Sequence, residues 1–264
     1  VAALLLAVCY QHVVHSHYAT VDAAVAFLFT CAVYRSLLII SDKRLFNYLA
    51  AGFVAGLAAG TKFNGIIAVA ALAAAHWSGA TGGTMIKRLF SREWLLGLAA
   101  VIAGHFAACP YFYLDFGAAW QEIEALQSFH ASSGFNLWYY LTDVSRDYWG
   151  MPAGIVCAAG AFRYLLTKTA TLRMLAITVL AVIFFASLHR YVEAKYIICA
   201  FPLAAVLGAS LLDEGYRILP DRLRQILACV ALLVLVMHPL SLIVRWDADR
   251  AALTLGNAHS RMAK

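Results

Sequence analysis

The sequence predicts an all-α bundle of membrane-spanning helices, and three observations support this fold class. Of the 264 residues, 63% are hydrophobic and 13% are charged, against about 45–50% and about 25% in soluble domains. Apolar runs long enough to cross a bilayer recur along the chain, and the Lys and Arg residues fall in short clusters between them. So few charges could not cover the surface of a water-soluble domain, so we expect lipid to surround the bundle.

The spans are expected in chain order, each approaching the roughly 20 apolar residues that cross a bilayer. Val1 to about His12 is expected to be the end of a first span, and the chain is expected to lack residues at both ends. The further predicted spans are Asp22 to Ile40, Trp94 to Phe112, Trp149 to Leu166, Met174 to Leu188, Tyr196 to Leu212 and Ile226 to Val244.

The stretch from Asn47 to Trp77 differs, because polar and glycine residues from Gly60 to Gly65 interrupt it. This pattern predicts two short helices that meet at Lys62. Half-length helices need neighbouring protein around them, because their end groups cannot be left in lipid.

The connections between spans alternate between two sides of the membrane, and most basic residues fall on one of them. One side receives Lys43, Arg44, Lys87, Arg88, Arg92, Arg163, Lys168, Arg173, Arg217, Arg222 and Arg224. The positive-inside rule makes this side cytoplasmic. The Lys62 turn, the loop Tyr113 to Tyr148 and the turn His189 to Lys195 are then outside.

The outer loop is expected to carry an amphipathic helix over Ala118 to Phe129, because Trp120, Ile123 and Leu126 recur at helical spacing. Residues 1–246 are expected to form the transmembrane domain, and residues 247–264 to begin an extracytoplasmic segment.

Several function classes are not expected. The net charge of +6 is scattered, without the basic stripe that nucleic-acid binding requires. The six cysteines lie in apolar stretches and form no CxxC pair, so they are expected to be buried hydrophobic residues. The sequence contains no Walker loop, GxSxG, HExxH or Rossmann fingerprint.

Ionisable residues at membrane depth cost free energy, which makes them functional candidates. Asp22 opens a predicted helix, where it could act as a cap with Thr20. The nearby His12, His15 and His17 are harder to explain by capping. His15 and His17 could bind a metal or an anionic head group, although a His-x-His pair alone is a weak zinc signal.

Lys62 is the second candidate, because a lone ammonium between apolar half-helices needs an anion; its alternative is snorkelling to the interface. The third is the turn His189 to Tyr196, where Arg190 fits phosphate and Tyr191 could stack on sugar. An aromatic belt would explain that turn almost as well. His130 opens a loop that could cover a substrate cleft.

Two segments together resemble a known family. They are His15-Ser-His-Tyr-Ala-Thr-Val-Asp22 and the Gly-rich run from Ala50 that ends Gly-Thr-Lys62-Phe-Asn-Gly65. This combination resembles the GT-C glycosyltransferases of family 39, which include protein O-mannosyltransferases and bacterial aminoarabinose lipid A transferases. The likeness extends to Cys109-Pro-Tyr-Phe-Tyr-Leu-Asp-Phe, Tyr148-Trp-Gly-Met-Pro, Arg190-Tyr and Phe201-Pro-Leu-Ala.

The resemblance implies an enzyme of the bacterial inner membrane that moves a sugar from a polyprenyl-phosphate donor to a lipid, glycan or protein acceptor outside. Lys62, His17 and Arg190 would bind the donor phosphate. The other substrate contacts would come from His15, Tyr191, Lys195 and His130. In mannosyltransferase relatives an Arg stands five positions before the helix-opening Asp, where this chain has His17.

Asp22 is expected to support catalysis, because the family's acidic base lies in a loop upstream of Val1. Residues Val1 to Lys264 alone are therefore expected to be inactive. No firm cofactor is implied, and the histidines leave a divalent metal open. The alternatives are a multi-pass transporter and a noncatalytic lipid-binding subunit. The latter half of the chain lacks a second Gly-rich broken hairpin, which argues against a transporter built from inverted repeats.

Overall fold

The computed structural model describes residues 1–18, 20–78, 84–130, 135–188 and 193–262. Those residues form helices and no strand, which confirms the predicted all-helical class. The elements are α1 Ala2–Ala7, α2 Tyr10–His17, α3 Val21–Ser41, α4 Leu45–Thr61, η1 Phe63–Ile67, α5 Ala68–Ser78, α6 Met85–Leu89, α7 Arg92–Ala108, α8 Tyr111–Leu114, α9 Phe116–His130, α10 Leu137–Tyr148, α11 Met151–Leu165, α12 Ala170–Ser187, η2 Ala194–Ala200, α13 Phe201–Ile218 and α14 Asp221–Met262.

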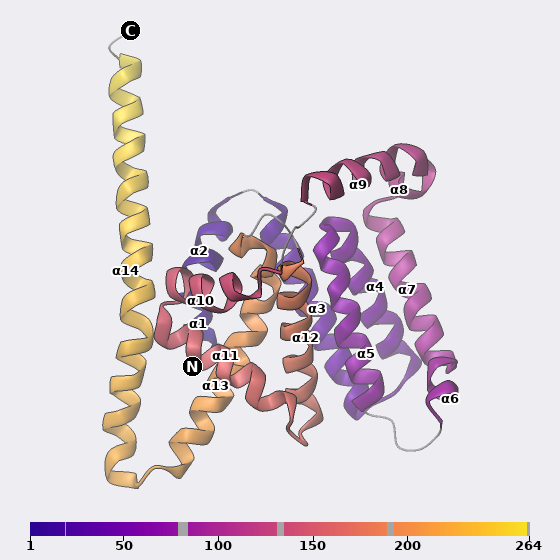
Figure 1. The fold of residues 1–264 in the computed structure, drawn as a ribbon, viewed down its shortest axis with the longest axis horizontal. Helices are drawn as coiled ribbons and strands as arrows, with labels where there is room; N and C mark the ends of the chain where they lie inside the picture. Colours follow the sequence, from indigo (N-terminus) through magenta and orange to yellow (C-terminus); the bar gives the residue numbers. More distant parts are fainter. Residues whose placement is uncertain (19, 79–83, 131–134, 189–192, 263–264) are drawn as a thin grey trace.

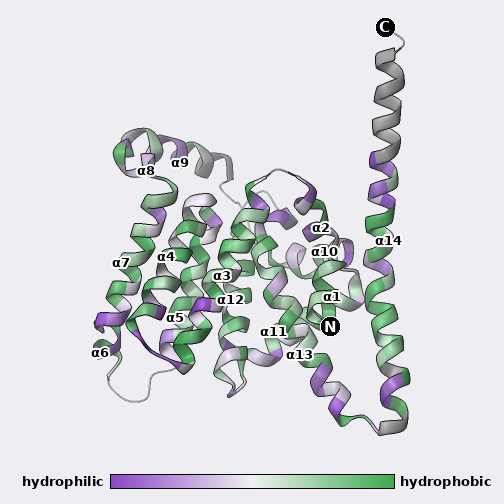
Figure 2. Cartoon of the chain, turned by 180° about the vertical axis from the view of Figure 1, so that it is seen from behind, coloured by the Kyte–Doolittle hydropathy of each residue, from purple (hydrophilic) through white to green (hydrophobic). Residues whose placement is uncertain are grey.

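Four helical stretches are long and apolar enough to cross a membrane. They are Val21–Ser41, Ala170–Ser187, Lys195–Ile218 and Leu223–Arg250. Their length and composition indicate a membrane protein. The apolar residues run along the middle of the helices in Figure 2, and polar residues gather toward their ends.

The connections between helices fall at two ends of the bundle in Figure 1. The α3–α4, α11–α12 and α13–α14 connections and the C-terminal end of α5 lie at the lower end. The α4–η1 and α7–α8 connections, the N-terminal end of α3 and the C-terminal end of α12 lie at the upper end. The basic clusters of the sequence flank the lower connections, so this arrangement agrees with the alternation that the sequence predicts.

Two expected boundaries differ from the structure. The span predicted from Trp94 to Phe112 ends at Ala108, because Pro110 disfavours helical backbone at Cys109 before it. The apolar run from Val1 to His12 is split into α1 and α2, with Cys9 in an extended conformation. Nothing in the residue pattern marks this second break.

The outer loop holds more helix than the sequence predicts. The amphipathic helix expected over Ala118 to Phe129 is confirmed as α9, which extends sideways from the top of α7 (Figure 1). Helix α10 was not predicted, although Tyr140 and Val144 stand four residues apart and are both buried. Gly150 then turns the chain into α11 with a φ of 74°, a left-handed conformation that favours glycine.

The predicted span Ile226 to Val244 lies within α14, which continues as helix through residues 247–262. Figure 1 shows α14 beside the bundle, with its C-terminal part extending past the upper end. Pro239 lies inside this helix.

Helices α4 and α7 pack with their backbones close together, because glycines line both surfaces. A Cβ atom added to Gly56 would overlap the carbonyl oxygen of Val101, and one added to Gly104 would overlap that of Phe53. Small residues allow such close approach between membrane helices. This pair forms a rigid support for the upper end of α4, where Lys62 follows.

We expect Gly56→Ala to destabilise the protein by about 1–3 kcal/mol, the usual cost of forcing atoms into a packed interface. The measurement is thermal denaturation in detergent. Gly117→Ala is the matched control, because open space surrounds Gly117 on α9. Alanine there should leave the melting temperature unchanged or raise it slightly. Equal melting temperatures for the two variants would contradict the packing described for α4 and α7.

Candidate functional site

Lys62 lies at the break between α4 and η1, where the sequence predicts two short helices to meet. Its backbone is extended, with φ −154° and ψ 135°. Gly65 allows η1 to fold back closely, because a Cβ atom there would overlap the carbonyl oxygen of Ala58. The expected broken hairpin at Lys62 is therefore confirmed. It returns as a 3-10 turn followed by α5.

The Lys62 ammonium donates a hydrogen bond to Oδ1 of Asp22, the second residue of α3. The Lys62 side chain is 22% exposed and that of Asp22 is 7% exposed. The ammonium thus ends on a buried carboxylate. Asp22 compensates the ammonium charge, because a buried charge is costly unless it is paired.

His15 completes a three-residue cluster with Asp22 and Lys62. Its Nδ1 lies 3.4 Å from Oδ2 of Asp22, and its Nε2 lies 2.6 Å from Nε2 of Gln11. Burial lowers the pKa of His15, and the negative charge of Asp22 opposes that effect in part. His15 is therefore neutral near pH 7. Thr20 makes no side-chain cap at the start of α3, so the expected capping pair of Thr20 and Asp22 is not formed.

A second ion pair lies at the start of η2, between Lys195 and the preceding Glu193. Lys195 Nζ is 2.5 Å from Glu193 Oε2. The ammonium groups of Lys195 and Lys62 each lie 5.8 Å from the centroid of the Tyr196 ring. The backbone carbonyl of Tyr196 accepts a hydrogen bond of 3.1 Å from Asn64. One aromatic ring therefore holds two cations from distant parts of the sequence.

His17 faces away from this cluster. Its ring stacks on Trp246 of α14 at 5.4 Å, and the Arg250 guanidinium lies 5.3 Å from that Trp246 ring. The physical reason is helical phase: residues two apart on a helix point about 200° apart, so His15 and His17 cannot both face Asp22. In the structure His17 therefore contacts α14, and its expected role beside Lys62 in phosphate binding stays a prediction.

The remaining predicted site residues cannot be placed. Arg190 and Tyr191 lie outside the described residues, and so does the side chain of His130, the last residue of α9. Among the described residues, no three His, Cys, Asp or Glu side chains are grouped to hold a metal ion.

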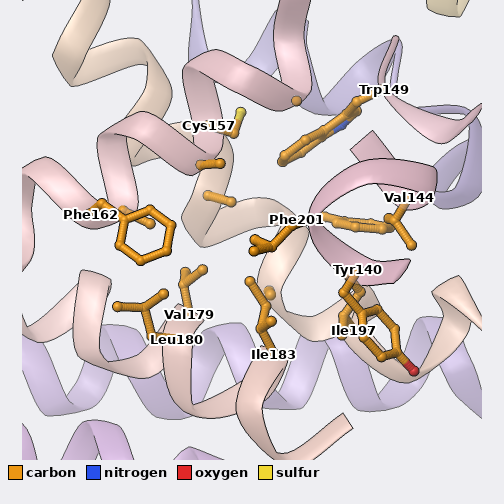
Figure 3. A pocket seen from close by; sticks show the side chains of 16 residues that line it. Tyr140, Val144, Trp149, Cys157, Phe162, Val179, Leu180, Ile183, Ile197 and Phe201 are labelled. Carbon is orange, nitrogen blue, oxygen red and sulfur yellow. The ribbon is translucent and has the colours of Figure 1, made fainter. Parts of the chain in front are cut away.

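An apolar pocket adjoins the charged cluster through η2 (Figure 3). Tyr196 touches Lys62, while the next residue on η2, Ile197, lines the pocket. Helices α10, α11, α12 and α13 supply the other walls, with side chains that include Val144, Trp149, Phe162, Val179, Ile183 and Phe201. A pocket lined by such apolar side chains favours binding of a hydrocarbon chain.

Sequence reasoning missed Gln11 as part of this site. Glu193 and Tyr196 belong to the candidate turn His189 to Tyr196, but the contact between that turn and Lys62 was not predicted. Gln11 precedes His15 by four residues, which is a helical contact distance and was a usable signal. The role of Tyr196 depends on the approach of η2 to the Lys62 turn, which no local pattern shows. No protein-family model, curated protein or solved structure matches the chain.

Proposed function

We propose that this chain is the transmembrane part of a glycosyltransferase that moves a sugar from a polyprenyl-phosphate donor to an acceptor. We place the active face outside the bacterial cytoplasmic membrane, at the end of the bundle that holds Lys62. One observation carries the proposal: two ammonium groups meet on Tyr196, and the same turn forms a wall of an apolar pocket. A lipid-linked phosphate has the matching chemistry, an anion joined to a hydrocarbon chain.

The phosphate would bind beside Lys62 and Lys195. Both ammonium groups have carboxylate partners, Asp22 and Glu193, so the cluster carries no net charge while His15 is neutral. An arriving phosphate therefore meets cations that are already oriented by their carboxylates. Preorganised cations stabilise the charge that develops on a leaving phosphate without reorganising during the reaction.

Asp22 serves this site as a supporting carboxylate. One of its oxygens accepts from Lys62 and the other faces His15. A carboxylate engaged in this way orients its partner, and it is poorly placed to accept a proton from an acceptor. This arrangement supports the expectation that the catalytic base lies elsewhere.

The reaction forms one bond and breaks one. The acceptor hydroxyl oxygen attacks the anomeric carbon of the sugar, and the bond from that carbon to the phosphate oxygen breaks. Polyprenyl phosphate leaves with the bonding electrons, and the hydroxyl proton passes to the base. Lys62 and Lys195 would offset the charge gained by the leaving phosphate.

The test compares a polyprenyl phosphate with the uncharged polyprenol of equal chain length. The reconstituted full-length protein should bind the phosphate more tightly, and Lys62→Ala should remove most of that preference while leaving polyprenol binding unchanged. Lys43→Ala is the matched control, because Lys43 is exposed at the opposite end of the bundle. Equal binding of phosphate and polyprenol by the unaltered protein would contradict the proposal.

The topology that the proposal requires is tested by cysteine labelling. A cysteine at Ser41 should react with a membrane-impermeant maleimide only from the cytoplasmic side. A cysteine at Gln121, which is exposed on α9, should react only from outside. The unaltered chain is the control that measures labelling of the native cysteines. Labelling of both positions from one side would refute the orientation.

A further inference from the structure

Gln11 is a buried polar residue that the proposed reaction does not use. It lies on α2, is 9% exposed, and faces the His15 ring one helical turn later. Buried amides are normally held by hydrogen bonds. The amide nitrogen of Gln11 and Nε2 of His15 are 2.6 Å apart, so each provides the other with a partner.

The hydrogen positions follow from what each neighbour can accept. The amide nitrogen of Gln11 can only donate, so the His15 Nε2 that it contacts is the acceptor. A neutral imidazole carries one hydrogen, which then lies on Nδ1. This nitrogen is 3.4 Å from Oδ2 of Asp22 and makes no hydrogen bond to it. With the opposite orientation of the amide, Nε2 would carry the hydrogen and Nδ1 would be a second acceptor beside the carboxylate.

We infer that Gln11 is a positioning residue that holds His15 in the Nδ1–H tautomer, and thereby keeps a ring N–H, and not a second acceptor, beside the Asp22 carboxylate that pairs with Lys62. The order of contacts is Gln11, His15, Asp22 and Lys62. His15 places an N–H beside Oδ2 of Asp22 while Lys62 occupies Oδ1. Without Gln11, the His15 nitrogen facing Asp22 can lose its hydrogen, and two acceptors would then oppose each other.

The tautomer can be measured without any assumption about the reaction. Solid-state NMR of the full-length protein in lipid, labelled with ¹⁵N and ¹³C histidine, distinguishes the two neutral tautomers and the imidazolium. The His15 signal is identified by its loss in His15→Gln. We expect the Nδ1–H tautomer in the unaltered protein at neutral pH, and its replacement in Gln11→Leu. The Nε2–H tautomer in the unaltered protein, or an unchanged tautomer in Gln11→Leu, would overturn the inference.

Gln11→Glu provides a second variant of nearly the same shape. A carboxylate at position 11 accepts a hydrogen from Nε2, so both ring nitrogens carry hydrogen and the imidazolium is favoured. We expect the pKa of His15 to rise by about 1–3 units, the effect of an opposite charge in contact. The charged and titratable groups already acting on the pKa of His15 are unchanged in this variant; they are His12, Asp22, Lys62, Glu193 and Lys195. A pKa that stays in place would also overturn the inference.

The kinetic consequence rests on the proposed function. Gln11→Leu should lower sugar transfer about tenfold, equivalent to the loss of one ordinary hydrogen bond. Gln121→Leu on the exposed face of α9 is the control and should transfer normally. A changed tautomer with unchanged transfer would count against the proposed role of Asp22 and Lys62 in the reaction, while the tautomer measurement would still support the assignment of Gln11.

Discussion

Replacing Lys62 by alanine is expected to lower sugar transfer about 10²–10³-fold, the usual effect of removing one preorganised group that stabilises a developing anion. The ammonium lies where the donor phosphate would bind, fixed by Asp22 and by the ring of Tyr196. The measurement is the initial rate of transfer by the full-length protein in lipid vesicles. Lys62→Arg retains the charge but changes its geometry, so we expect an intermediate rate.

The matched control is Lys43→Ala, which removes an exposed lysine at the opposite end of the bundle. Its rate should equal that of the unaltered protein. A folded Lys62→Ala protein that transfers sugar at the normal rate would show that the ammonium has no part in the reaction. Its pairing with Asp22 would then be structural.

Replacing Asp22 by alanine is expected to destabilise the protein by about 3 kcal/mol, near the lower end of the cost of leaving one member of a buried ion pair alone. The lower end applies because the Lys62 side chain is 22% exposed and keeps some water. Thermal denaturation in detergent measures the loss. The double variant Asp22→Ala with Lys62→Met should recover most of it, because no unpaired charge remains.

Asp143→Ala is the control for this experiment, because Asp143 pairs with Arg146 in an exposed position on α10. Exposed pairs contribute about 0–1 kcal/mol, so the melting temperature should hardly change. Equal changes in melting temperature for Asp22→Ala and Asp143→Ala would mean that the Asp22–Lys62 pair is as solvent-exposed as the surface pair. The buried pairing of Asp22 with Lys62 would then be wrong.

The sequence predicts the elements whose signals are local. The span from Asp22 to Ile40 appears as α3, because a long apolar run ends at charged residues. The break at Lys62 is visible because glycine and polar residues interrupt an apolar stretch. The extent of α14 and the split between α1 and α2 were not predicted, since neither has a hydropathy signal of its own.

The residues of the candidate site can be predicted from the sequence, but their contacts cannot. Asp22, His15 and Lys62 are each recognisable as ionisable residues near membrane depth, and the structure brings them together. Their pairing joins residues 40 positions apart, so it depends on how α3 packs against the end of α4. His15 and His17 point to different faces of α2, and a sequence motif alone does not show which face each residue takes.

The most direct test of the proposed function supplies the reconstituted full-length protein with a panel of polyprenyl-phosphate sugars and candidate acceptors. Mass spectrometry follows both products of each reaction. The proposal predicts that one donor yields equal amounts of free polyprenyl phosphate and glycosylated acceptor, and that both products disappear together in Lys62→Ala. Donor binding or movement across the membrane, with the glycosyl phosphate bond intact throughout the panel, would contradict it in favour of a lipid-binding subunit or a transporter.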